Sequence, residues 1–110
     1  ARVIGQARQA RGPADLAADF SAPEAAQALW EAALERSGGA IDVLVNNAGL
    51  FAANPLDAAD GAWLEAWEDT LRVNLTSAAQ LSRFAVRHWR ARGVGGRIVH
   101  VASRAGHRGD

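Results

Sequence analysis

The chain lacks several residue types that carry common chemistry. Its 110 residues contain no cysteine, tyrosine or lysine, so every basic side chain except three histidines is an arginine. Without cysteine, the chain forms no disulfide and offers no thiolate nucleophile. The histidines are scattered, and their spacing does not indicate a metal site. No apolar run approaches the length that spans a bilayer, and the first residues do not resemble a signal peptide.

The residues that are present indicate a small folded unit. Apolar residues make up 49% of the sequence, enough for a packed core, and the formal net charge is zero. A zero net charge argues against nucleic acids and acidic membranes as partners, and we expect a cytoplasmic protein. The sequence does not begin with methionine, and Arg2 to Gly5 already has the pattern of a strand. We therefore expect residues 1–110 to form a single, incomplete domain cut from a longer protein.

The stretch from Ile41 to Val45 gives the clearest strand signal. Its residues are mostly apolar and β-branched, and glycines precede it, so we predict a strand buried on both faces of a parallel sheet. In such sheets ligands bind outside the carboxyl ends of the strands, where Asn46 to Gly49 would lie. These four residues suit either a close approach of the backbone to a flat ligand or a simple strand-ending turn.

Strand and helix signals alternate along the rest of the first half. Weaker strand candidates cover Arg2–Ala7 and Asp15–Phe20. The next residues predict a helix start, with Ser21 as the cap and Glu24 reaching back to it. Apolar residues then recur at helical spacing, namely Ala26, Leu29, Trp30, Ala33 and Leu34. Gly38 is a candidate for the C-terminal end of this helix.

A second helical pattern runs from about Ala62 to Arg92, and a last strand candidate covers Arg97–Ala102. Asn74 to Ser77 contains types that weaken a helix interior, so we predict two helices nearly end to end with a kink at Asn74. The apolar stripe of the second helix consists of Ala78, Leu81, Ala85 and Trp89, and its opposite face, with Gln80, Arg83, Arg87 and Arg90, is most simply a solvated surface. Strands alternating with helices predict an α/β fold with a parallel sheet.

Three motifs in register resemble the short-chain dehydrogenase/reductase family, in particular its 3-oxoacyl-(acyl-carrier-protein) reductase-like members. Asn46-Asn47-Ala48-Gly49 is similar to the family's motif after strand 4, and Trp67 with Asn74-Leu75 is similar to its helix motif. The segment from Arg97 to Ser103 is similar to strand 5 and the active-site serine. The resemblance covers essentially the whole chain and implies a partial Rossmann-type doubly wound parallel sheet.

The family's strand order, 3-2-1-4-5, implies how this sheet is arranged. The chain would hold strands 2 to 5 and lack strand 1 and the C-terminal part of the fold. Strand 1 would lie between Arg2–Ala7 and Ile41–Val45, and both of these strands would then carry unpaired backbone groups. We therefore expect residues 1–110 alone to close up, to be molten or to aggregate.

The resemblance also implies roles for individual residues. Ser103 would be the catalytic serine that hydrogen-bonds the substrate oxygen, although by itself it also fits a strand-end cap. Asn74 would be a further catalytic residue whose backbone holds a proton-relay water, although a junction between helices also explains its position. The residues along the adenosine half of the cofactor would be Asn47, Ala48 and Gly49, with Asp19 and Phe20 at the adenine ring.

Cofactor choice is predicted from the residues near the ribose. In dinucleotide-binding folds an acidic residue recognises a free 2′-hydroxyl group, whereas an arginine accommodates a 2′-phosphate. Gln6-Ala7-Arg8 has no carboxylate nearby, and Arg8 is always charged and can fork onto a phosphate. We therefore expect NADP, with NAD as the alternative if Arg8 is only a solvated surface residue.

Two parts of the family pattern are missing from residues 1–110. They are the glycine-rich loop that holds the pyrophosphate and, past Ser103, the Tyr-x-x-x-Lys pair that supplies the general acid/base. We expect a parent enzyme that transfers hydride between a nicotinamide cofactor and a carbonyl or secondary alcohol, with the chain alone inactive. A non-catalytic family member that serves as a binding or scaffolding module and an unrelated nucleotide-binding α/β domain are the alternatives.

Partners follow from the same resemblance. The loop Leu50–Gly61 is apolar and does not specify the small-molecule substrate. Family members usually pack long helices of two subunits together, so we expect the 62–92 helices at the interface of a homo-oligomer. Trp63, Trp67 and Trp89 support this expectation, because aromatic residues are enriched at interfaces.

Overall fold

The computed structural model describes residues 2–108, and in this range short strands alternate with helices. The strands are β1 (Gly5–Ala7), β2 (Asp15–Ala17), β3 (Val43–Asn46) and β4 (Arg97–His100). The helices are α1 (Ala25–Arg36), α2 (Asp60–Leu71), α3 (Ser77–Arg92) and the short α4 (Ala105–Arg108), with a π-helical turn, η1 (Arg72–Thr76), between α2 and α3. The predicted α/β class is confirmed.

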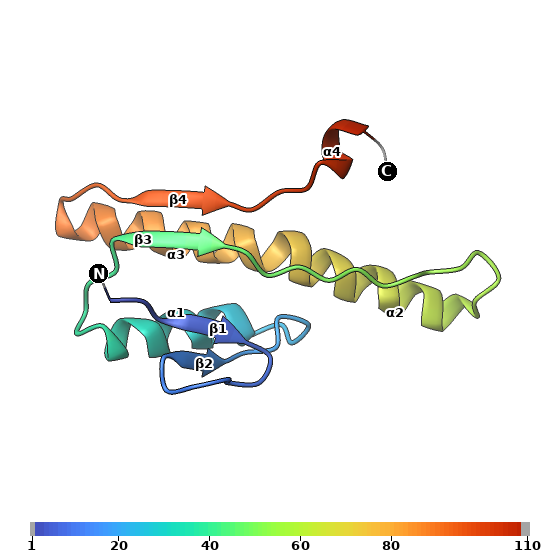
Figure 1. The fold of residues 1–110 in the computed structure, drawn as a ribbon, viewed down its shortest axis with the longest axis horizontal. Helices are drawn as coiled ribbons and strands as arrows, with labels where there is room; N and C mark the ends of the chain where they lie inside the picture. The colour runs from blue at the N-terminus through green and yellow to red at the C-terminus, as the bar shows by residue number, and fades with distance from the viewer. Residues whose placement is uncertain (1, 109–110) are drawn as a thin grey trace.

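The strands form two parallel pairs. β1 pairs with β2, with Gln6 opposite Leu16, and β3 pairs with β4, with Leu44 opposite Ile98. Across the molecule in Figure 1 the strands follow the order β2, β1, β3, β4, and no ladder joins β1 to β3 within residues 2–108. The parallel pairing is as predicted, in the order that the family resemblance implies, and the strands do not close up on each other.

The strands are shorter and more exposed than predicted. Val43 and Val45 of β3 are 50% and 54% exposed, so the prediction that this strand is buried on both faces is wrong. Figure 1 shows why, because α1 lies behind β1 and α3 lies behind β3, all on one side of the strands. Leu44 and Ile98 point to the covered side and pack against the core. None of the described helices covers the other face.

The start of α1 differs from the prediction. Ser21 does not cap the helix, because its main-chain N–H and its hydroxyl both donate to Asp19 Oδ1, at 3.0 and 2.8 Å. The residue before the helix is Glu24, and no side chain caps it. The predicted capping box is therefore wrong, since a local turn of the Asx type competes for the same serine. The C-terminal end is confirmed, because Gly38 follows the helix with a φ of +76°.

The kink predicted at Asn74 is confirmed as the π-helical turn η1, which makes α2 and α3 nearly continuous (Figure 1). Two hydroxyl groups flank it and donate to carbonyls one turn back. Thr70 Oγ1 donates to Ala66 O at 2.7 Å, and Ser77 Oγ donates to Val73 O at 2.8 Å. Such bonds compete with the main-chain ladder and bend helices, so they account for the position of the irregular turn.

The core lies between α1, α3 and the covered faces of the strands. Its buried apolar residues are Phe20, Ala26, Trp30, Leu81, Ala85 and Trp89. Of the stripe predicted on α3, Ala78 is only half-buried, and Ser77 is buried beside it. Trp89 belongs to the interior and not to an exposed interface, which corrects its expected role. Among the described residues, no helix combines the length and apolar character needed to cross a membrane.

The last turns of α3 fix the approach to β3. Trp89 Nε1 donates to the carbonyl oxygen of Ile41 at 2.7 Å, and the N–H of Ile41 donates to His88 Nε2 at 3.3 Å. Both main-chain groups of Ile41 are thus satisfied by side chains, which explains why the strand begins only at Val43. This contact aligns β3, and therefore the segment that follows it, against the helix.

Candidate functional site

The predicted site residues gather at the carboxyl ends of the strands. Arg8 directly follows β1, Asp19 lies two residues past β2, Asn47 follows β3, and Ser103 lies shortly after β4. Because the strands are parallel, all four ends lie on one side of the molecule, marked by the arrowheads in Figure 1. This is the side where open α/β sheets bind their ligands.

Asn74 lies in η1 and is bonded to the loop that follows β3. The N–H of Leu50 donates to Asn74 Oδ1 at 2.6 Å, and Asn74 Nδ2 donates to the carbonyl oxygen of Leu50 at 2.8 Å. The side-chain amide is therefore used to hold the loop. The main chain of Asn74 is the part left for the water-binding role that the resemblance implies.

No neighbouring atom of the protein requires a glycine at position 49. A Cβ atom added there would meet Asn74 Oδ1 at 3.8 Å, an ordinary van der Waals contact, and its φ is not in the left-handed region. Asn47 and Gly49 are exposed, as is Ala48 between them. The segment after β3 is therefore open to a ligand that lies flat against its backbone, and a glycine permits the closest approach.

Ser103 is exposed and lies three residues past the end of β4. Its Oγ accepts the N–H of Ala105 at 3.2 Å, and its carbonyl oxygen accepts the N–H of Gly106 at 3.1 Å. The hydroxyl thus caps the start of α4 rather than the end of β4. Capping uses an oxygen lone pair only, so the hydroxyl hydrogen remains available to donate to a substrate oxygen.

A polar hollow of about 630 Å³ lies at the carboxyl ends of β1 and β2. It is lined by Ala7, Arg8, Gln9, Ala10, Arg11 and Asp19. Hydrogen bonds from the main chain and then the hydroxyl of Ser21 hold the pKa of the Asp19 carboxyl below its usual 3.8, and the charge of Arg8 adds to this effect. Asp19 is therefore negatively charged at neutral pH, beside the guanidinium of Arg8.

Phe20 occupies a different environment from the other predicted site residues. Its side chain is 6% exposed and belongs to the core. Only its main chain is left for a contact with an adenine ring. Its neighbour Asp19 is exposed, so the two residues at the end of β2 face opposite environments.

The sequence did not predict a polar cluster that consists of Asn46, Ser82 and His100. Asn46 Nδ2 donates to Ser82 Oγ at 3.3 Å and lies 3.2 Å from His100 Nδ1, which joins the ends of β3 and β4 to α3. In the register of the strands, Asn46 is opposite His100. A signal was present, since Asn46 falls on the same alternating face as Leu44, which packs against the core, and so needs a polar partner there.

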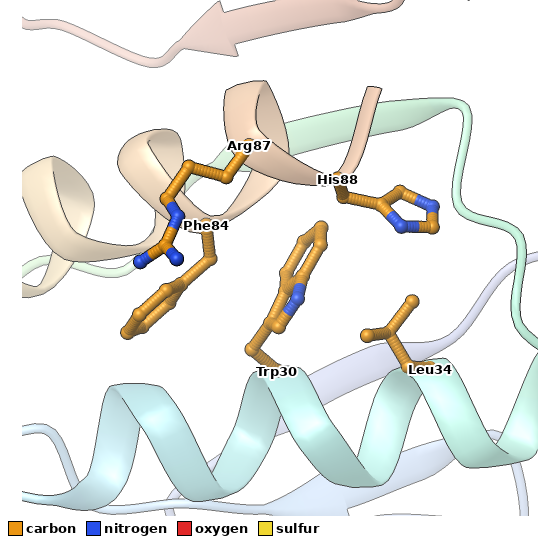
Figure 2. Close-up of a pocket in the computed structure, with 5 residues that line it drawn as sticks. All are labelled: Trp30, Leu34, Phe84, Arg87 and His88. Carbon is orange, nitrogen blue, oxygen red and sulfur yellow. The ribbon is translucent and has the colours of Figure 1, made fainter. Parts of the chain in front are cut away.

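A second hollow, of about 290 Å³, lies between α1 and α3. Figure 2 shows Trp30 and Leu34 on α1 facing Phe84, Arg87 and His88 on α3. The ring centroids of Trp30 and Phe84 are 6.5 Å apart, and those of Trp30 and His88 are 5.8 Å apart. None of the predicted site residues lines it. Among the described residues there is also no group of acidic, histidine or cysteine side chains that could hold a metal ion.

Comparison with known proteins decides the family. The family model described as short chain dehydrogenase matches residues 2–110. The chain belongs to the short-chain dehydrogenase family. It is 37% identical over 86 residues to 3beta-hydroxysteroid dehydrogenase 1 of Eggerthella lenta, covering 78% of this chain and 31% of that enzyme. It is 35% identical over 95 residues to the 3-oxoacyl-[acyl-carrier-protein] reductase of Vibrio cholerae, covering 86% and 37% of the two chains.

Solved structures of dehydrogenases share the fold. One from Mycobacterium smegmatis is 40% identical, with a TM-score of 0.68, over 84% of this chain and 37% of that one. A 4-hydroxyisoleucine dehydrogenase complexed with NADH is 25% identical, with a TM-score of 0.77, over 96% and 46%. The chain thus spans less than half the length of these two solved structures. The partial Rossmann-type fold is confirmed, and the acyl-carrier-protein reductases are one of several named groups that it matches.

Proposed function

We propose that the protein carrying this chain is an NADP-dependent oxidoreductase that acts on a carbonyl or secondary alcohol. The observation that carries the proposal is the convergence of Arg8, Asp19, Asn47 to Gly49 and Ser103 at one end of parallel strands, in a member of the short-chain dehydrogenase family. The relatives support it, since they are named as dehydrogenases and reductases.

The residues of the chain fit a dinucleotide. The exposed segment from Asn47 to Gly49 would lie along the adenosine half, with Asp19 and the main chain of Phe20 at the adenine. When bound, the nicotinamide supplies or accepts the hydride. Ser103 donates its hydroxyl hydrogen to the substrate oxygen while its Oγ still accepts the N–H of Ala105. Asn74 fixes the loop at Leu50 and offers its main chain to a water.

Replacing the serine tests this assignment. Ser103→Ala in the whole protein should lower kcat by roughly 10²- to 10⁴-fold, the range for loss of a proton-handling group, and leave cofactor affinity unchanged. Ser37→Ala is the matched control, because Ser37 lies at the end of α1 and its hydroxyl donates to Leu34 O within the same helix. Turnover of Ser103→Ala within about threefold of the wild type would contradict the role. Cofactor binding without turnover in the wild type would favour a binding module.

Cofactor preference is tested at Arg8. Arg8→Asp removes a cation that can pair with a 2′-phosphate and adds a like charge, so NADPH should become the poorer cofactor. We would compare kcat/KM for NADPH and NADH in the whole protein, with Arg92→Asp on α3 as the control. A ratio that changes by less than about threefold, or ~1 kcal/mol, would show that Arg8 does not read the phosphate.

A homo-oligomer contact is proposed on α2 and η1. Leu64, Trp67 and Leu75 are 50%, 49% and 62% exposed, and the rings of Trp63 and Trp67 stack 5.6 Å apart. Exposed apolar and aromatic side chains on neighbouring turns are typical of an interface. Trp67→Glu should shift the whole protein towards the monomer in light scattering, and Arg83→Glu on the polar face of α3 should not. A monomeric wild type would contradict this contact.

A further inference from the structure

We infer that the hollow between α1 and α3 is a separate binding site, which takes a small aromatic carboxylate. It is the hollow of about 290 Å³ that is lined by Trp30, Leu34, Phe84, Arg87 and His88. His88 bonds Ile41 just before β3 begins, whereas Asn47 to Gly49 follow the other end of that strand. The hollow is therefore distinct from the proposed cofactor site, and the inference does not depend on the proposed function.

Most of the lining of the hollow is apolar. Trp30 is 8% exposed, and Leu34 and Phe84 are half-buried and pack against the same core. A third ring between Trp30 and Phe84 would need roughly 7 Å, twice the carbon contact distance, and their centroids are only 6.5 Å apart. A ligand ring would thus lie against the edges of this pair, beside Leu34. The volume is small for a ligand pocket, so the site suits a compound with a single ring.

Arg87 decides the charge of the ligand. Figure 2 shows its guanidinium turned towards α1 on one side of Trp30, with the ring of His88 on the other side. The Arg87 side chain is exposed and forms no hydrogen bond or ion pair within residues 2–108, and none of the five lining residues is acidic. A cation would be repelled. One guanidinium balances the single charge of a carboxylate better than the roughly −1.5 to −2 charges of a phosphate monoester.

His88 supplies a hydrogen-bond donor on the opposite side of the hollow. Its Nε2 accepts the N–H of Ile41 at 3.3 Å, so the ring carries its proton on Nδ1. Within the described residues, no acceptor bonds this Nδ1–H. A ligand whose carboxylate pairs with Arg87 can therefore place an oxygen at the far end of its ring as the acceptor for His88. A hydroxyphenyl carboxylate has both groups in this arrangement.

The imidazole of His88 connects the ligand to β3. A ligand oxygen that accepts the Nδ1–H polarises the ring, so Nε2 becomes a better acceptor for the N–H of Ile41. The carbonyl oxygen of Ile41 is held by Trp89, the next residue of α3, at 2.7 Å. Binding should therefore protect the Ile41 amide against local opening. Leu50 follows the other end of β3 and does not line the hollow, so its amide is the reference.

Two probes isolate the charge, because 4-hydroxyphenylacetate and 4-hydroxyphenylacetamide differ only in the carboxylate. Titration calorimetry on the whole protein should give a Kd on the order of 0.1–1 mM for the acid, as expected of so small a ligand. The amide should bind at least about tenfold more weakly, since it loses the charge-assisted bond. Arg87→Gln should remove this preference, and Arg87→Lys should keep part of it. Arg83→Gln, on the exposed face of α3, is the matched control and should leave the preference unchanged.

Hydrogen exchange and competition complete the test. Loss of the preference in Arg87→Gln, together with an Ile41 amide that the acid protects more than it protects Leu50, is the supporting result. The inference is overturned if the wild type binds neither probe, binds both equally, or keeps its preference in Arg87→Gln. An unchanged Ile41 amide would show that the ligand does not reach His88 and would also overturn it. Saturating NADPH should leave the Kd of the acid unchanged, and competition would place the acid at the proposed cofactor or substrate site instead.

Discussion

Asn74 and Leu50 exchange two hydrogen bonds, one in each direction, between the π-helical turn and the loop after β3. The two residues are 24 positions apart in the sequence, and the contact connects the helix kink to the segment expected to hold the cofactor. An amide side chain can do this because it offers a donor and an acceptor together. The pair therefore gives Asn74 a positioning role that is separate from catalysis.

The first prediction concerns this pair. Asn74→Ala removes both hydrogen bonds, each worth about 0.5–1.5 kcal/mol, so the loop after β3 should open locally more often. Hydrogen exchange of the Leu50 amide in the whole protein should become faster. Asn74→Asp keeps the oxygen that accepts the Leu50 N–H, so that amide should stay better protected than in Asn74→Ala. Unchanged exchange at Leu50 in Asn74→Ala would show that the pair does not hold the loop.

The second prediction concerns the approach of Gly96 to Trp89. A Cβ atom at Gly96 would overlap the indole ring of Trp89, which is buried and held by its bond to Ile41 O. Gly96→Ala should therefore lower the free energy of unfolding of the whole protein by about 1–3 kcal/mol, as overpacking does. Gly95→Ala is the control, because a Cβ there meets nothing, and it should change stability by no more than about 0.5 kcal/mol. Equal urea midpoints for the two variants would contradict the prediction.

The third prediction concerns the titration of Asp19. Its pKa is lower in the folded protein than its usual 3.8, so the ionised carboxylate stabilises the fold above that pH. This contribution should disappear as the pH falls through the lower, folded-state pKa. Asp19→Asn should therefore melt below the wild type at pH 6, and the difference in Tm should shrink below about pH 3.8.

A nuclear magnetic resonance titration provides the direct measurement. Ser21→Ala removes the hydroxyl that donates to Asp19 Oδ1 but keeps the stronger main-chain donor, so the pKa of Asp19 should rise only part of the way. A pKa at or above 3.8 in the wild type would show that Ser21 does not hold the carboxylate.

The fourth prediction concerns residues 1–110 expressed alone. Within residues 2–108, β1 pairs only with β2, and β3 pairs only with β4, and isolated two-stranded pairs are marginally stable in water. Their free edges and the exposed Val43 and Val45 also favour association. We expect no sharp cooperative melt, a weak near-UV circular dichroism signal from the four tryptophans, and little NADPH binding. A cooperative melt together with micromolar NADPH affinity would contradict this expectation.

The sequence by itself determined the features that depend on local patterns. The spacing of Ala26 and Trp30 predicted α1, and the spacing of Leu81, Ala85 and Trp89 predicted α3, because one face of each helix must be apolar to be buried. Gly38 predicted the end of α1, since it adopts a positive φ at little cost. Asn74 predicted the break between α2 and α3. The family motifs also predicted which strand ends carry the candidate site residues.

The tertiary structure decided what depends on contacts between distant segments. Ser21 has the residue type of a helix cap, but it bonds Asp19 instead, and no local pattern distinguishes the two. Val43 and Val45 have the composition of buried residues, but their exposure depends on which elements cover the strand. Asn46 meets His100 only because parallel pairing places them opposite each other. Arg11 joins Arg8 in one hollow only because the loop folds back onto Asp15, a contact set by the three-dimensional path of the chain.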